Sequence, residues 1–209
     1  MKQKKTIRIG CIGDSITAGT GLVSPKQEAF PARLETLLHP NATVLNFGNG
    51  GKTMRNDLGV DSYVNSNTYQ NLMQDAESLD IVTVMLGTND AYHAKGWTDY
   101  EVTRFKTDCK ALFAALAEKN PAMRFVLMNS PACFGEKPFR YNMLPLRTLQ
   151  SELVTELSEA GCNIHFFDMY SVTKPLEEYF PDQLHPNKDA HLIIAQALCE
   201  LIERLMIGN

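Results

Sequence analysis

Three residues of the sequence carry the side chains of a nucleophilic hydrolytic site. Ser15 follows an apolar run, and Asp182 and His185 lie three residues apart in a loop before the last predicted helix. A serine hydroxyl is a poor nucleophile until an imidazole removes its proton, and a carboxylate on the other ring nitrogen fixes the tautomer and stabilises the cation. One tight loop can carry both Asp182 and His185, with His185 projecting toward Ser15. We therefore predict a catalytic triad with Ser15 as the nucleophile.

A tetrahedral intermediate also needs hydrogen-bond donors for its oxyanion. Small polar residues follow two further apolar runs, in segments 46–53 and 87–90. The first segment offers the backbone N–H of Gly51, and the second offers the side-chain amide of Asn89. Together with the N–H of Ser15 itself, these donors are predicted to form an oxyanion hole.

The elements that must position these residues form an α/β pattern. Five short runs rich in β-branched residues predict buried strands at 7–12, 43–47, 81–86, 125–128 and 164–167. Segments with helical periodicity separate the strands, which favours a three-layer α/β/α sandwich with a five-stranded parallel sheet. Ligands bind such sheets at the carboxyl ends of the strands, where the candidate residues fall.

Two helices are marked clearly. One begins at the capping-box pair Thr98 and Glu101 and ends at Asn120, and the other follows Pro186. Weaker periodicity predicts helices over 27–38, 69–77 and 146–160. Repeats, low-complexity tracts and linkers are missing from the sequence, so a single catalytic domain over 1–209 is predicted.

Composition narrows the class of protein. The chain has 209 residues, 44% hydrophobic and 21% charged, which is typical of a soluble protein with a full core. Its net charge of -4 does not favour nucleic acid as a partner, and its apolar runs are too short for a membrane span. Five cysteines without a CxxC pair favour reduced thiols in the cytoplasm and neither a metal nor a redox cofactor. A homo-oligomer is left open.

The sequence resembles the SGNH hydrolases, also called GDSL-type esterases, across essentially its whole length. Four blocks carry the resemblance in family order: 13–15 with Gly-Asp-Ser, 46–53 with Gly51, 87–90 with Asn89, and 182–185. Ile16 stands where the GDSL name has leucine. The resemblance implies a flavodoxin-like sandwich that hydrolyses acyl esters through an acyl-enzyme, without a metal or cofactor.

Two other classes of protein were weighed against this interpretation. Gly51, Lys52 and Thr53 imitate the end of a phosphate-binding loop, but Asn46 occupies the position where that loop requires glycine. A catalytically idle ligand-binding module on the same fold is the other alternative, because fold does not determine function. Such a module would be expected to have lost a triad residue, whereas this sequence retains all three.

The walls of the substrate pocket should come from the loops after the strands, at 52–67, 91–97 and 131–145. Aromatic residues that could stack on a sugar or aryl ring are Tyr92, Trp97, Phe134, Phe139 and Tyr141. Packing of the loops is an equally good explanation for these rings. Arg55 and Arg140 could meet an anionic group, and His93 could line the pocket.

The preferred substrate is a short acyl ester, most simply an acetyl ester of a carbohydrate. This prediction depends on the loops, which lack a long apolar run suited to a fatty acyl chain. The resemblance also leaves open a lysophospholipase or thioesterase-like hydrolase, and an acyltransferase if an alcohol replaces water.

Overall fold

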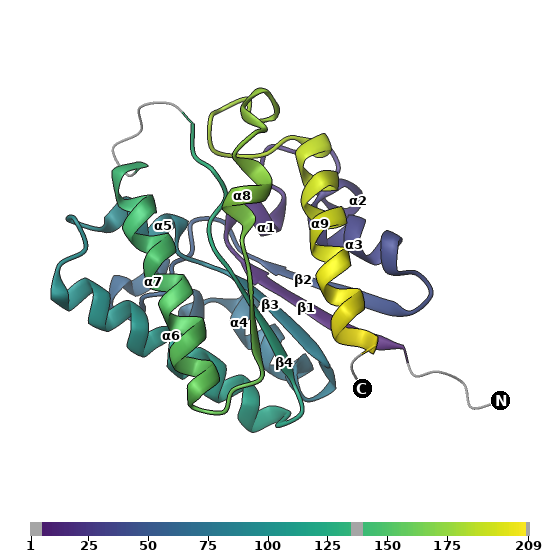
Figure 1. Cartoon of the computed structure of the whole chain (residues 1–209), viewed down its shortest axis with the longest axis horizontal. Helices are drawn as coiled ribbons and strands as arrows, with labels where there is room; N and C mark the ends of the chain where they lie inside the picture. Colours follow the sequence, from purple (N-terminus) through teal and green to yellow (C-terminus); the bar gives the residue numbers. More distant parts are fainter. Residues whose placement is uncertain (1–5, 135–139, 208–209) are drawn as a thin grey trace.

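The computed structural model describes residues 6–134 and 140–207, and a five-stranded parallel sheet lies at its centre (Figure 1). The strands are β1 (Ile7–Gly13), β2 (Ala42–Gly48), β3 (Ile81–Met85), β4 (Arg124–Met128) and β5 (Ile164–Phe167). Their order is β2-β1-β3-β4-β5, and each neighbouring pair is parallel. This is the order of flavodoxin-like folds, so the predicted fold class is confirmed.

Helices cover both faces of the sheet. One face carries α1 (Ser15–Ala18), α2 (Pro25–Glu28), α3 (Phe30–Leu38), α8 (Met169–Thr173) and α9 (Lys188–Ile207). The other face carries α4 (Asn67–Asp75), α5 (Thr88–His93), α6 (Asp99–Lys119) and α7 (Arg140–Glu159). Short 3-10 turns lie at η1 (Asn56–Asp61), η2 (Tyr63–Asn65), η3 (Ala76–Ser78) and η4 (Glu177–Tyr179). The three predicted layers are therefore present.

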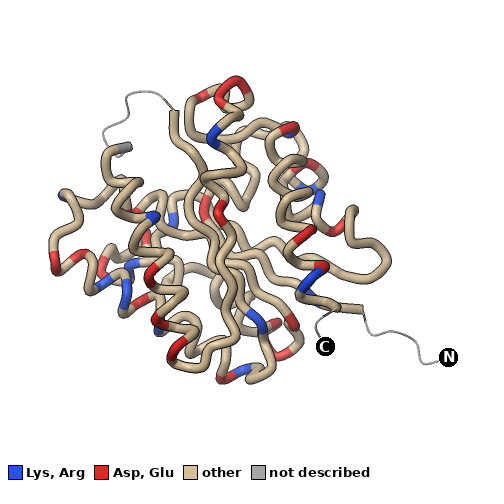
Figure 2. The backbone as a smooth tube through the Cα atoms, viewed as in Figure 1, with Lys and Arg blue, Asp and Glu red and all other residues tan. Residues whose placement is uncertain are grey.

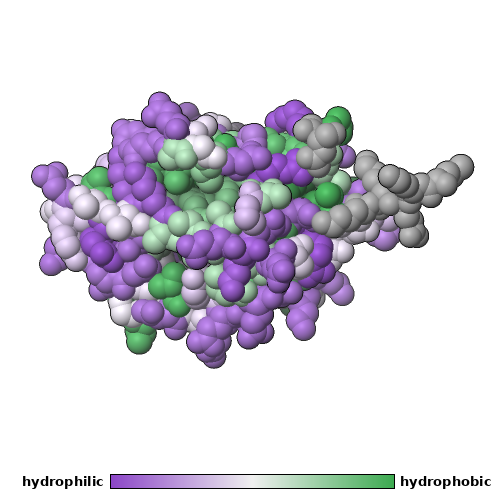
Figure 3. Space-filling view, turned by 90° about the horizontal axis from the view of Figure 1, so that it is seen from below, coloured by the Kyte–Doolittle hydropathy of each residue, from purple (hydrophilic) through white to green (hydrophobic). Residues whose placement is uncertain are grey.

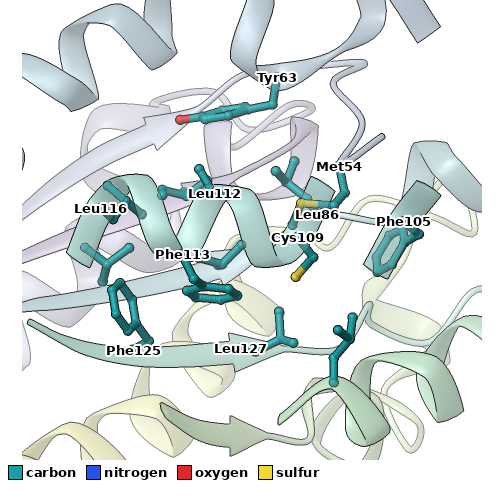
Figure 4. Close-up of a cluster of buried hydrophobic side chains, with 14 of the residues drawn as sticks. Met54, Tyr63, Leu86, Phe105, Cys109, Leu112, Phe113, Leu116, Phe125 and Leu127 are labelled. Atoms are coloured by element: carbon teal, nitrogen blue, oxygen red, sulfur yellow. The ribbon is translucent and has the colours of Figure 1, made fainter. Parts of the chain in front are cut away.

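The core has two halves because successive residues of a strand point to opposite faces of the sheet. Along β1, Cys11 packs with the α3 and α9 layer, whereas Ile12 packs with the α6 layer. Figure 4 shows the second half, in which side chains of α6 lie against β4. The rings of Phe113 and Phe125 pack edge to face with their centroids 4.9 Å apart. Such a pair stabilises a fold by about 1 kcal/mol beyond the burial of its apolar area.

The predicted helices are partly corrected. The capping box of Thr98 and Glu101 begins α6 as expected. A single helix over 27–38 is wrong: α2 and α3 are separate, and Ala29 between them is extended. Pro31 has no N–H to continue a helix from α2, and proline is tolerated in the first turn of a new one. The helix predicted from 146 begins at Arg140 and contains Pro145.

The surface carries charges of both signs. Lysine and arginine are interspersed with aspartate and glutamate around the backbone (Figure 2). Seen from below, hydrophilic residues cover most of the surface and apolar residues gather near its middle (Figure 3). Within residues 6–134 and 140–207, we find no helix with the length and apolarity needed to cross a membrane, and no cluster of side chains suited to a metal ion. All five cysteines are free thiols.

Candidate active site

The predicted nucleophile lies at the carboxyl end of β1, an interior strand of the sheet. Ser15 is the first residue of α1, and Oδ1 of Asp14 caps this short helix by accepting a hydrogen bond from Ile16 N–H at 2.9 Å. The first four N–H groups of a helix have no partner within it, so the N–H of Ser15 is available to a ligand. The turn therefore presents a hydroxyl and a backbone donor from the same residue.

A glycine on the neighbouring strand lets α1 lie this close to the sheet. A Cβ atom on Gly48, the last residue of β2, would lie 2.2 Å from the backbone nitrogen of Ala18. No real Cβ atom approaches backbone that closely, so a larger residue here would displace α1. The position of Ser15 thus depends on Gly48 as well as on its own strand.

The structure brings Ser15, His185 and Asp182 into one hydrogen-bonded series. Ser15 Oγ lies 2.9 Å from His185 Nε2, and His185 Nδ1 lies 2.6 Å from Asp182 Oδ2. Asp182 Oδ1 also accepts the backbone N–H groups of Leu184 and His185, at 3.0 and 2.6 Å. Figure 1 shows α1 and the loop before α9 at the same edge of the sheet. The imidazole is therefore held on both sides in the orientation a general base requires.

Asp182 is strongly biased toward its ionised form. Partial burial opposes ionisation, but the hydrogen bonds from the His185 ring and from two backbone N–H groups outweigh it and lower the pKa of Asp182 to about 2. A carboxylate in this state favours the Nδ1–H tautomer of His185, which leaves Nε2 as the acceptor facing Ser15.

The segments that carry the other predicted donors are joined to each other. Asn89 is the second residue of α5, and its Nδ2 donates to the carbonyl of Lys52 at 2.9 Å. Gly51 adopts a φ of 74°, a left-handed conformation that favours glycine. A Cβ atom on Gly50 would lie 3.7 Å from that of Ser15, so this loop lies directly beside the predicted nucleophile. Asn89 Nδ2 retains a second N–H for a ligand.

A buried carboxylate that the sequence analysis gave no role secures this loop. Asp90 is fully buried and accepts the backbone N–H groups of Met54 and Arg55, at 2.8 and 2.9 Å. Burial raises the pKa of Asp90 to about 6, against these hydrogen bonds and the charge of Arg55. The sequence signal that could have identified Asp90 is its position directly after Asn89. A carboxylate next to a predicted donor can accept backbone N–H groups from the loop after a neighbouring strand.

Arg55 is used within the fold. Its guanidinium is buried and pairs with Asp57 at 2.8 Å and with Glu101 at 3.4 Å. The structure therefore satisfies this cation internally, contrary to the idea that it meets an anionic substrate group. His93 lies near the surface, with Nε2 3.6 Å from Asp61 Oδ2.

The predicted aromatic residues fall into two groups. Trp97 is buried and its Nε1 donates to the carbonyl of Asn142 at 2.8 Å, and the Phe134 ring packs edge to face against Phe180. These two rings are used in packing within the fold. Tyr92 and Tyr141 are exposed, at 65% and 81%. Phe139 and the side chain of Arg140 lie outside the described residues.

Another histidine supports the helix that follows the loop with Asp182 and His185. His191 on α9 is fully buried, and its Nδ1 accepts the N–H of Phe30 at 3.0 Å. Burial, with a smaller contribution from the charges of His185 and Arg33, lowers the pKa of His191 to about 4. The neutral ring thereby ties α9 to α3.

The geometry can now be compared with known proteins. A family model described as GDSL-like lipase/acylhydrolase matches residues 9–198. The chain belongs to this family. The predicted SGNH, or GDSL-type, carboxylic ester hydrolase is thereby confirmed at the level of the family.

Relatives of this GDSL-like chain include esterases of several kinds. An acetylxylan esterase of Xylanibacter ruminicola is 33% identical over 114 residues, a match that spans 54% of this chain and only 22% of that relative. An aryl esterase structure from M. smegmatis is 20% identical with a TM-score of 0.71, covering 96% of this chain and 100% of that one. An acetylxylan esterase structure from Geobacillus stearothermophilus is 20% identical with a TM-score of 0.69, and the match covers 97% of this chain and 96% of that one. At 20% identity, the two structures establish a shared fold.

Proposed function

We propose that this GDSL-like protein hydrolyses short acyl esters, in the first place acetyl esters of carbohydrates, with Ser15 as nucleophile and His185 as general base. The observation that carries the proposal is the continuous series from Ser15 through His185 to Asp182, at 2.9 and 2.6 Å. A hydroxyl, an imidazole and a carboxylate in this order can activate the hydroxyl at neutral pH.

In the proposed acylation step, His185 Nε2 accepts the Ser15 proton while Oγ attacks the ester carbonyl. The negative oxygen of the tetrahedral intermediate receives hydrogen bonds from the N–H groups of Ser15 and Gly51 and from the amide of Asn89. As the intermediate collapses, His185 returns the proton to the departing alcohol. The acyl group remains on Ser15 Oγ.

In the proposed deacylation step, water takes the place of the alcohol. His185 removes a proton from the water, the hydroxide attacks the acyl carbonyl, and the proton then passes to Ser15 Oγ as the acid is released. Asp182, with a pKa of about 2, stays ionised throughout and stabilises the imidazolium that forms twice per cycle.

Two observations support a short acyl group on a sugar. The acetylxylan esterases from X. ruminicola and G. stearothermophilus are named for acetyl groups on a polysaccharide. A cavity bordered by residues from the segment 49–67 is lined by more polar than apolar residues, which suits a carbohydrate better than a fatty acyl chain.

The testing experiment is hydrolysis of p-nitrophenyl acetate, butyrate and octanoate, followed by an acetylated xylo-oligosaccharide. Ser15→Ala, purified in parallel, measures the background. We expect acetate to be the best of the three aryl esters and the acetylated oligosaccharide to be turned over, with both activities lost in Ser15→Ala. A preference for octanoate would contradict the acetyl ester, and turnover equal to that of Ser15→Ala would contradict the esterase.

A further inference from the structure

A cavity of about 590 Å³ lies beside the loop that carries the proposed oxyanion donor Gly51. Its lining includes Asn49, Lys52, Val60, Asn65 and Asn67. The first two follow β2, and the others belong to the 3-10 turns and the start of α4. This volume is within the range of about 300 to 1,000 Å³ that small-molecule sites occupy.

The cavity is separated from the nucleophile by very little backbone. Asn49 and Lys52 flank Gly50 and Gly51, and a Cβ atom on Gly50 would lie 3.7 Å from that of Ser15. The carbonyl of Lys52 accepts the hydrogen bond from Asn89. Because this loop borders both the nucleophile and the cavity, a substrate held at Ser15 can reach the cavity by passing over Gly50 and Gly51.

Two amides of the lining are held by hydrogen bonds and still have hydrogen-bonding capacity. Asn49 Nδ2 donates to Thr68 Oγ1 at 3.0 Å, and Asn65 Nδ2 donates to the carbonyl of Gly59 at 2.8 Å. Each amide has two N–H groups and an oxygen acceptor, so one N–H and the oxygen remain for a ligand. A hydroxyl is likewise both donor and acceptor. Paired donors and acceptors of this kind suit the neighbouring hydroxyls of a sugar ring.

Other ligand chemistries fit the lining less well. A fatty acyl chain needs apolar walls, whereas Val60 is the one large aliphatic side chain among the described lining residues, and it is 82% exposed. An anion would meet Lys52 as the one cation of that lining, and its Nζ already donates to the carbonyl of Val60 at 2.5 Å. A neutral, polyhydroxylated ligand remains.

We infer that this cavity is a subsite for a sugar residue of an acetylated glycan, bound next to the ester that Ser15 attacks. The inference rests on the proposed function and adds to it the residues that select the substrate. Asn65 and Asn67 are the specificity residues of this subsite, because their exposed side chains line the cavity and they lie outside the loop that carries Gly51.

The test compares two esters in each variant. For Asn67→Ala, the ratio of kcat/KM on acetylated xylotriose to that on p-nitrophenyl acetate should fall about five-fold, the effect of one lost hydrogen bond. The double variant with Asn65→Ala should lower the ratio about 20-fold. Asn163→Ala is the matched control, since this exposed asparagine directly precedes β5 at the opposite edge of the sheet.

A second measurement does not depend on turnover. Titration of the wild-type protein with unacetylated xylotriose should shift the side-chain amide NMR signals of Asn49, Asn65 and Asn67 and leave that of Asn163 in place. Unchanged ratios, or amide signals that do not move, in a protein that still hydrolyses both esters would overturn the subsite alone. Absence of turnover on both esters in the wild type would instead overturn the proposed function.

Discussion

Asn89 Nδ2 donates a hydrogen bond to the backbone carbonyl of Lys52 at 2.9 Å, which joins α5 to the loop after β2. The next residue, Asp90, holds the same chain through the N–H groups of Met54 and Arg55. Two proposed oxyanion donors, from Gly51 and Asn89, are therefore fixed relative to each other before any substrate binds. Donors arranged in advance stabilise a developing charge without reorganisation during the reaction.

Replacement of Asn89 by alanine should therefore lower kcat for p-nitrophenyl acetate by about 100-fold to 1,000-fold, with a smaller change in KM. The loss reflects a donor that acts mainly in the transition state. Steady-state kinetics measure it, with Asn163→Ala as the control for an asparagine far from the site. A change confined to KM would show that Asn89 contributes to substrate binding only.

Ser15→Ala should lower turnover by at least about 1,000-fold while the protein stays folded, because the one side-chain hydrogen bond it removes is that to His185. A fluorophosphonate probe gives an independent measurement. The wild-type protein should gain the mass of the phosphonyl group on the peptide that contains Ser15, and the variant should gain none. Labelling at another serine would contradict the assignment.

Asp182→Asn should reduce kcat by about 100-fold to 10,000-fold, because an amide no longer favours the productive tautomer of His185 or stabilises its cation. The pKa of Asp182, about 2, also predicts that this residue causes no loss of wild-type rate between pH 8 and pH 4. A pH profile of kcat/KM tests both points. An acid-side ionisation above pH 4 that is present in the wild type and absent from Asp182→Asn would be inconsistent with this assignment.

Asp14→Asn should change how stability depends on pH. Asp14 is fully buried, and burial raises its pKa to about 6, whereas an unfolded aspartate titrates near 4. Ionisation of Asp14 therefore destabilises the native protein as pH rises from about 4 through 6. Asparagine keeps the oxygen that accepts Ile16 N–H but does not ionise. From pH 4 to pH 8, the free energy of unfolding of the variant should therefore rise by on the order of 2 kcal/mol relative to that of the wild type.

Urea unfolding of both proteins at the two pH values measures this gain as a difference of differences. Other titrating groups, such as Asp90, affect both proteins equally and cancel in the comparison. A free-energy difference between Asp14→Asn and the wild type that is the same at pH 4 and pH 8 would show that Asp14 titrates normally in the fold.

Two glycines near Ser15 should respond very differently to alanine. Gly48→Ala places a Cβ atom 2.2 Å from the Ala18 nitrogen and should cost about 3 kcal/mol or more of unfolding free energy. In Gly51→Ala the new Cβ atom meets no atom within 4 Å. The loss of unfolding free energy should therefore come from the left-handed φ alone, which costs about 1 to 2 kcal/mol. Thermal or urea unfolding of the pair tests the order. Equal losses would mean that α1 moves away from β2 without cost.

The sheet could be predicted closely from the sequence because its strands are continuous runs of buried, β-branched residues. Each predicted strand agrees with the structure to within one residue at either end. The triad residues were predicted to meet since Ser15 and the 182–185 loop both fall where strands or their connections reach the carboxyl edge. Their hydrogen-bonding distances agree with that expectation, while their roles remain proposals.

Other features had no sequence signal strong enough to read. The helices α1, α5 and α8 have only four to six residues, which is too few to show helical periodicity. The pairing of Arg55 with Glu101 joins residues 46 positions apart, so only the tertiary fold reveals that this cation is already satisfied. Pro145 lies inside α7, and because proline usually ends a helix, the sequence gives little signal for the helical turn that precedes it.

The contact between Ser15 and His185 joins residues separated by 170 positions in the sequence. A contact of such long range can form only after the intervening strands have paired, and it contributes to the slow folding of parallel sheets. Ester hydrolysis would accordingly be among the last properties that a refolding molecule recovers, later than its helical circular dichroism. Catalytic activity in this protein would then report on complete folding, and a partly assembled sheet would give no signal.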